Sequence, residues 1–173
     1  MAKKTKRLLG KKEIKNGIKK LAQKLNNDYC DTSPIFVCIL KGAFMFLADL
    51  IRELNVPIRI DFLSVSSYGD SSRTSGVVKI IKDISIDIEG EDVLLVEDIV
   101  DTGLTLSYIF DFLKRKNPKS LKICALLEKK VRRTKKIKID YRGFFVPNKY
   151  VIGYGLDFCE KYRNLPEIDT MEF

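Results

Sequence analysis

Histidine is absent from this chain of 173 residues. Its absence excludes Ser-His-Asp and Cys-His nucleophile systems, and it excludes zinc sites ligated by imidazole. Any general base in the protein must therefore be a carboxylate or, less readily, a lysine, tyrosine or cysteine.

Cysteine is scarce, and the four cysteines lack the close spacing of a metal site. Cys38 and Cys124 lie within apolar runs, where a thiol behaves as a small hydrophobic group. We therefore expect all four cysteines, Cys30 and Cys159 included, to be reduced and structural.

Long apolar runs are also missing. Runs such as 35–40 and 93–96 fall well short of the roughly 18 consecutive apolar residues that a membrane-spanning helix needs. The first seven residues, MAKKTKR, lack the apolar segment and cleavage site of a signal peptide. We therefore expect a cytoplasmic protein, and the length and 45% hydrophobic content predict a single domain over residues 1–173.

The net charge of +9 is concentrated in two segments. Residues 1–24 contain ten lysines and arginines and residues 129–142 contain eight, so these segments hold 18 of the 32 basic residues. The rest of the chain is mildly acidic, with 14 basic residues against 21 acidic ones. Basic runs most often form solvated faces, with RNA, a membrane surface or an anionic substrate as the alternative explanations.

Hydrophobic periodicity predicts alternating helices and strands. Apolar residues recur at helical spacing in some segments, whereas short apolar runs bounded by turn residues are typical of buried strands. The expected helices are 11–27, 44–54 and 104–116, and the expected strands are 35–40, 58–65, 77–81, 93–96 and 121–127. This order predicts an α/β fold with a doubly wound, mainly parallel sheet flanked by helices.

The segment EDIVDTGLTL, residues 97–106, combines acidic and anion-binding features after the predicted strand 93–96. Ligands of α/β sheets bind beyond the carboxyl ends of the strands. Backbone N–H groups at the start of the following helix suit a phosphate, whereas Glu97 and Asp98 repel one. A phosphorylated ribose or a bound metal ion reconciles the two halves of the segment.

Helix capping is the structural alternative for this segment. A cap by Asp101 or Thr102 accounts for only one of the three acidic residues. The chain has neither a P-loop nor a G-x-G-x-x-G turn, so those nucleotide-binding folds lose weight.

Several motifs resemble those of a known family. VLLVEDIVDTG, residues 93–103, resembles the phosphoribosyl-pyrophosphate signature of type I phosphoribosyltransferases. Five further motifs follow the order seen in hypoxanthine-guanine phosphoribosyltransferases: LKGA at 40–43, SSYG at 66–69, LEK at 127–129, KYVIGYGLD at 149–157 and YRNLP at 162–166. The resemblance covers residues 8–170 and implies a type I phosphoribosyltransferase fold with a small hood formed by the chain ends.

The resemblance also implies a reaction and a set of roles. A 5-phosphoribosyl group moves from its 1-pyrophosphate to N9 of hypoxanthine or guanine, giving IMP or GMP and pyrophosphate. Glu97 and Asp98 are expected to hold the ribose hydroxyls directly or through Mg²⁺, and Asp101 to act as acid/base near purine N7. The 5-phosphate is expected at the backbone and hydroxyls of Thr102, Gly103, Leu104 and Thr105.

The remaining expected contacts follow the same resemblance. Pyrophosphate is assigned to Lys41, Gly42, Ser67, Tyr68 and Arg163, with a cis peptide at Lys41 and a mobile loop over residues 66–76. Purine recognition is assigned to Lys129 at O6, stacking on Tyr150, the backbone of Val151, and Asp157, which also ligates a second Mg²⁺. Magnesium suits such an oxygen-rich site, and Ala43 stands where some relatives have a second glycine.

Two alternatives remain open. A xanthine-guanine or pyrimidine-type enzyme has the same fold, and although Lys129, Tyr150 and Asp157 favour 6-oxopurines, they do not rank hypoxanthine, guanine and xanthine. An RNA-binding regulator on this fold would use the basic segments and would bind RNA in a salt-dependent way even with Asp101→Asn. We favour the enzyme, a homodimer or homotetramer without membrane association, because the catalytic motifs are intact.

Overall fold

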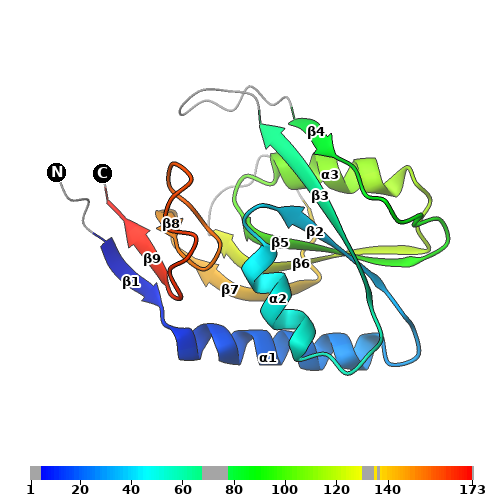
Figure 1. Ribbon diagram of the computed structural model, residues 1–173, viewed down its shortest axis with the longest axis horizontal. Coiled ribbons are helices and arrows are strands. Elements are labelled where there is room, and N and C mark those ends of the chain that lie inside the picture. The colour runs from blue at the N-terminus through cyan, green and yellow to red at the C-terminus, as the bar shows by residue number, and fades with distance from the viewer. Residues whose placement is uncertain (1–4, 68–77, 130–134, 136, 173) are drawn as a thin grey trace.

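The computed structural model describes residues 5–67, 78–129, 135 and 137–172. Its main body is a six-stranded sheet with the order β4-β3-β2-β5-β6-β7 (Figure 1). All neighbours in this sheet are parallel except β3 and β4, which are antiparallel. The strands are β2 (Ile35–Leu40), β3 (Arg59–Ser67), β4 (Val78–Lys82), β5 (Asp92–Val100), β6 (Ser120–Lys129) and β7 (Tyr141–Val146).

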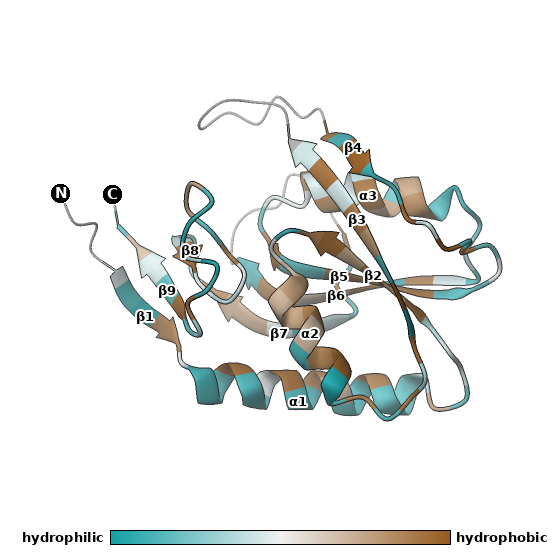
Figure 2. Cartoon of the chain, in the orientation of Figure 1, coloured by the Kyte–Doolittle hydropathy of each residue, from teal (hydrophilic) through white to brown (hydrophobic). Residues whose placement is uncertain are grey.

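Helices cover both faces of the sheet, because its central strands are apolar on both sides. α1 (Lys11–Asp28) and α2 (Phe44–Arg52) lie on one face and α3 (Leu104–Lys114) on the other (Figure 1). Leu94 and Val96 join the core cluster under α1 and α2, whereas Val93 and Leu95 join the cluster under α3. In Figure 2 the strands at the centre of the sheet are largely brown, whereas α1 changes between teal and brown along its length.

The chain ends form a separate hood beside the sheet. β1 (Thr5–Leu9) pairs antiparallel with β9 (Ile168–Met171), which pairs antiparallel with β8 (Tyr150–Ile152). Both termini therefore lie at the same end of the molecule (Figure 1). Residues 153–167 connect β8 to β9, and within this connection Gly155 and Glu160 contact the turn that follows β2.

The sequence-based expectations for the fold are largely confirmed. The doubly wound, mainly parallel sheet and the hood are both present. All four cysteines are free thiols, and Cys38 and Cys124 are buried. Within the described ranges, no helix is long and apolar enough to cross a membrane. The expected strand 93–96 was too short, because β5 continues to Val100.

Candidate functional site

β5 carries the acidic residues inside the sheet rather than after it. Glu97 and Ile99 remain in register with Ala125 and Leu127 of β6, so the strand ends only at Val100. The expected boundary at Val96 is therefore wrong. The strand continues through its two acidic residues because its backbone stays paired with β6 as far as Val100. The two carboxylates are thereby held by a strand of the central sheet.

A pocket opens where β5 turns into α3. It has a volume of about 230 Å³, and it brings together Glu97 with the residues expected to hold phosphate. Gly103 has the left-handed φ of 81°, which favours glycine, and it begins α3 without a side-chain hydrogen bond. Capping by Asp101 or Thr102 is therefore not what these residues do. The lining includes Ile39, Val65, Asp101, Thr102, Gly103, Leu104 and Thr105.

Asp101, which lines this pocket, forms an ion pair with Lys129. The Lys129 Nζ lies 2.7 Å from Asp101 Oδ2, and β6 supplies the lysine while the β5-α3 turn supplies the carboxylate. The Lys129 side chain is only 13% exposed, against 48% for Asp101. Lys129 is the first residue of the basic segment 129–142, but its side chain is not a solvated charge. It is a largely buried hydrogen-bond donor that points to Asp101.

The acidic pair on β5 is electrostatically strained. Burial, followed by the nearby charge of Asp98, raises the pKa of Glu97 well above its ordinary value of 4.5. Asp98 is itself buried, and its Oδ1 accepts a hydrogen bond of 2.6 Å from the Ile99 N–H. A bound hydroxyl donor or cation would relieve the repulsion between these two groups.

The Lys41-Gly42 turn packs directly on Asp98. The peptide bond between Leu40 and Lys41 is cis, as the resemblance implies. A Cβ at Gly42 would lie 1.6 Å from Asp98 Oδ2, and a Cβ at Gly155 would lie 2.1 Å from the Gly42 carbonyl oxygen. Ala43 has an ordinary right-handed backbone, so it needs no glycine. The turn after β2 is therefore held between β5 and the hood.

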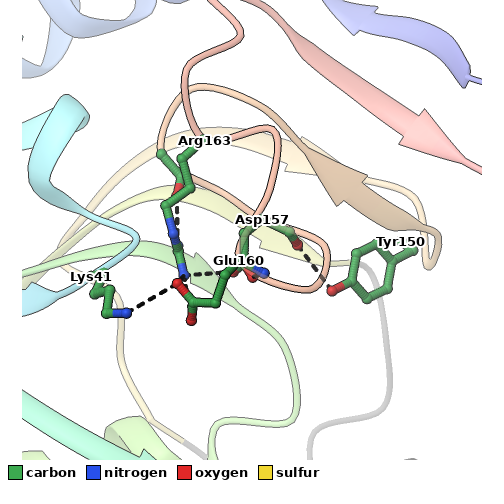
Figure 3. A network of polar contacts seen from close by, with 6 residues as sticks. Lys41, Tyr150, Asp157, Glu160 and Arg163 are labelled. Carbon is green, nitrogen blue, oxygen red and sulfur yellow. Dashed lines mark hydrogen bonds and ion pairs between the residues drawn. The ribbon is translucent and has the colours of Figure 1, made fainter.

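The hood contributes a polar network above this turn (Figure 3). Arg163 donates to the Gly155 carbonyl oxygen at 2.8 Å, and its other terminal nitrogen lies 2.9 Å from Asp157 Oδ1. The Tyr150 hydroxyl donates to the Asp157 carbonyl oxygen at 3.0 Å, and the Tyr150 ring meets the Phe158 ring edge-on. Tyr150 is 41% exposed, so part of its ring surface is open for stacking.

Glu160 is the residue of this network that sequence reasoning missed. Its carboxylate lies 3.0 Å from Lys41 Nζ and 3.4 Å from an Arg163 nitrogen (Figure 3). It thereby joins two side chains that were both expected to bind pyrophosphate. The available signal was a short segment in which two acidic residues, Asp157 and Glu160, precede Arg163. No sequence pattern indicates the left-handed backbone that brings these side chains together.

Not every predicted site residue joins these contacts. Val151 is buried in β8 opposite Thr170. Ser67 is the last residue of β3, and the expected contact of its side chain lies outside the described residues, as do Tyr68 and most of the loop 66–76.

A metal ion would have to share its ligands with substrate. In the described part of the chain, no three His, Cys, Asp or Glu side chains gather into a metal site. Magnesium commonly uses one or two carboxylates together with waters and phosphate oxygens. Glu97 and Asp98, adjacent carboxylates on β5, fit that coordination, whereas Asp157 is a separate carboxylate that pairs with Arg163.

Comparison with known proteins identifies the relatives of this chain. Residues 4–159 match the family described as "Phosphoribosyl transferase domain". The chain is 47% identical to the hypoxanthine-guanine phosphoribosyltransferase of Bacillus subtilis, over 95% of this chain and 92% of that one, and 49% identical to its namesake from Aquifex aeolicus, over 98% and 96%. A solved hypoxanthine phosphoribosyltransferase from Staphylococcus aureus superposes with a TM-score of 0.92 at 43% identity, covering 96% of this chain and 91% of that chain.

Proposed function

The chain belongs to the hypoxanthine-guanine phosphoribosyltransferases, and on this premise we propose how its residues carry out the reaction. The enzyme acts in purine salvage. It transfers the 5-phosphoribosyl group of 5-phosphoribosyl 1-pyrophosphate to N9 of hypoxanthine or guanine. The products are IMP or GMP and pyrophosphate.

The contact between Lys129 and Asp101 carries the proposal for the base. A 6-oxopurine with its proton on N7 presents an acceptor, O6, beside a donor, N7–H. A lysine and a carboxylate 2.7 Å apart provide the complementary donor and acceptor. The O6–N7 edge of the base faces these two groups: Lys129 donates to O6, and Asp101 accepts the N7 proton as N9 bonds to C1 of the ribose and pyrophosphate leaves.

A 6-amino group reverses this match. Adenine would place a donor against Lys129, and the largely buried ammonium would lose its acceptor. The site therefore rejects adenine by leaving a polar group unpaired rather than by size. Tyr150 stacks on the base, the Val151 backbone contacts its edge, and Asp157 lies near the 2-substituent.

The sugar phosphate occupies the pocket at the start of α3. Backbone N–H groups and hydroxyls of residues 102–105 bind the 5-phosphate, aided by the positive end of the α3 dipole. Glu97 and Asp98 accept hydrogen bonds from the ribose hydroxyls. These carboxylates also stabilise positive charge that develops on the ribose ring as the bond to pyrophosphate breaks.

Pyrophosphate binds between the turn after β2 and the hood. Lys41 and Arg163 supply positive charge, Gly42 supplies close backbone approach, and Ser67 and Tyr68 complete the contact. Glu97 and Asp98 are the proposed ligands of one Mg²⁺, and Asp157 is the proposed ligand of a second. When bound, Mg²⁺ neutralises the charge that accumulates on the leaving pyrophosphate.

Three broader properties complete the proposal. The chain acts as one domain over residues 1–173. It forms a homodimer or homotetramer, as its membership of this family implies. It is cytoplasmic, because all four cysteines are free thiols, as is usual in a reducing compartment.

The test of the proposed function is a spectrophotometric assay of the purified protein. Nucleotide should form from phosphoribosyl pyrophosphate and Mg²⁺ with hypoxanthine or guanine, but not with adenine. Including xanthine ranks the kcat/KM values of the three 6-oxopurines. Asp101→Asn should lower kcat at least about tenfold while binding of the donor largely survives. Wild-type kcat in that variant would remove Asp101 from the mechanism. RNA binding that is salt-dependent and survives the substitution would instead support the regulator.

A further inference from the structure

Glu160 occupies the position between the two cations that are assigned to pyrophosphate. Its Oε2 lies 3.0 Å from Lys41 Nζ, on the turn after β2, and 3.4 Å from an Arg163 nitrogen, on the hood (Figure 3). The same guanidinium also contacts Asp157, whose distance of 2.9 Å is shorter. Glu160 is therefore the acidic group that bridges the two sides of the pyrophosphate site.

We propose that Glu160 is an internal counterion that competes with pyrophosphate for Lys41 and Arg163 and so sets the affinity of the site for the diphosphate group. This inference rests on the proposed function, in which those two cations bind pyrophosphate. A diphosphate carries acceptor oxygens and negative charge, as the carboxylate does, so both cannot hold the two cations in the same way. Binding of the diphosphate displaces Glu160, and its release lets Glu160 return.

Exposure makes this exchange inexpensive. The side chains of Lys41 and Glu160 are each 66% exposed, and exposed ion pairs contribute little net stability. Glu160 is thus placed to compete for both cations, but it is easily displaced by a group of higher charge.

The backbone around Glu160 directs its side chain into the site. Cys159, Glu160 and Tyr162 have φ values of 50°, 60° and 75°, in the left-handed region that non-glycine residues seldom adopt. The Glu160 N–H donates to Asp157 Oδ2 at 2.9 Å, which closes the turn. Such strain persists only where surrounding contacts maintain it, and strained residues cluster at functional sites.

A counterion of this kind benefits turnover by weakening the product complex. Pyrophosphate must leave after transfer, and a carboxylate that returns to the vacated cations lowers the free energy of the empty site. Product release limits kcat in many enzymes. The cost is a weaker complex with the pyrophosphate donor, which the substrate offsets through its ribose and 5-phosphate contacts.

The experiment compares Glu160→Gln with the wild type. Titration calorimetry with magnesium pyrophosphate should give a dissociation constant about twofold to fivefold lower in the variant, as expected for loss of an exposed competing charge. The KM for phosphoribosyl pyrophosphate should fall with it, while kcat stays constant or falls because pyrophosphate leaves more slowly. The matched control is Glu172→Gln, which removes an exposed carboxylate paired with Lys149 and should change neither constant.

Further variants separate this inference from the proposed site. In a Lys41→Met background, Glu160→Gln should produce a smaller gain, because one of the two contested cations is gone. If Lys41→Met and Arg163→Gln each left pyrophosphate affinity unchanged, the proposed site itself would be wrong. If those two variants weakened binding but Glu160→Gln left affinity unchanged, only the competition would be wrong. Weaker binding in Glu160→Gln also overturns it, since the carboxylate would then assist the ligand.

Discussion

Replacing Gly42 by alanine should damage the site through a single steric contact. The added Cβ would lie 1.6 Å from Asp98 Oδ2 and 2.6 Å from its carboxyl carbon, so one of the two groups must move. Asp98 is 8% exposed and is held by the Ile99 N–H. Retreat of the turn is opposed from the other side, because the Gly42 carbonyl oxygen packs against Gly155.

The size of the effect follows from this confinement. Overpacking of a closed contact typically costs about 1–3 kcal/mol, which corresponds to a fall of roughly 2–12 °C in the thermal midpoint of a chain this long. Displacing a substrate-positioning carboxylate by about 1 Å lowers kcat/KM by up to about a hundredfold. We therefore expect a less stable Gly42→Ala variant with a kcat/KM for phosphoribosyl pyrophosphate that is tenfold to hundredfold lower, on the order given by that displacement.

Thermal unfolding and steady-state kinetics measure the two effects. Gly10→Ala is the matched control, because a Cβ there meets its nearest atom at 3.4 Å and the residue has an extended backbone. As the N-cap of α1, Gly10 should cost about 1 kcal/mol or less when replaced, with unchanged kinetics. Gly42→Ala with the thermal midpoint and kinetic constants of the wild type would refute the reasoning.

Two further variants test the base and ribose contacts. Lys129→Ala removes a charged hydrogen bond of about 1.5–3 kcal/mol, so kcat/KM for hypoxanthine should fall about tenfold to hundredfold and discrimination against adenine should relax. Lys122→Ala on the same strand is its control, and unaltered purine kinetics in Lys129→Ala would contradict the O6 contact. Because the folded state raises the pKa of Glu97, its contribution to stability is complete below 4.5 and is lost as the pH rises through the folded pKa. Glu97→Gln should therefore raise the thermal midpoint at neutral pH by a few degrees and lower activity. The difference in stability between the variant and the wild type should grow between pH 4 and 8. A difference that stays constant over this range would show that Glu97 does not titrate in this way.

The central sheet was predictable because each of its strands has a recognisable pattern in its own short stretch of sequence. Parallel strands covered on both faces are continuous apolar runs, and 35–40 and 121–127 match β2 and β6 closely. The same rule misplaced the end of β5, since Glu97 and Asp98 interrupt the apolar run whereas pairing with β6 continues to Val100. Hydrogen bonding along a neighbour extends a strand beyond its apolar residues, and a single sequence does not display that neighbour.

The hood strands were not predicted individually for a different reason. β1, β8 and β9 are short and partly polar, and their pairing joins residues 5–9 with 168–171. No local pattern reports a contact across that separation. The connection to β9 also contains left-handed residues such as Tyr154 and Glu160 that are not glycine. Resemblance to a family located Asp157 and Arg163 in this connection, but only the structure shows that Glu160 bridges Lys41 and Arg163.

Strand order in the hood has a consequence for the order of events during synthesis. β8, which carries Tyr150 and Val151, is flanked by β9, and β9 is flanked in turn by β1. A nascent chain can complete the strands and helix that surround the phosphate pocket once β6 has left the ribosome. The hood strand that carries Tyr150 and Val151 depends instead on residues 168–171, which also pair with a segment made at the start of synthesis. The proposed site is thus finished in two stages: Asp101, Lys129 and the pocket at the start of α3 come first, and the hood contacts come last.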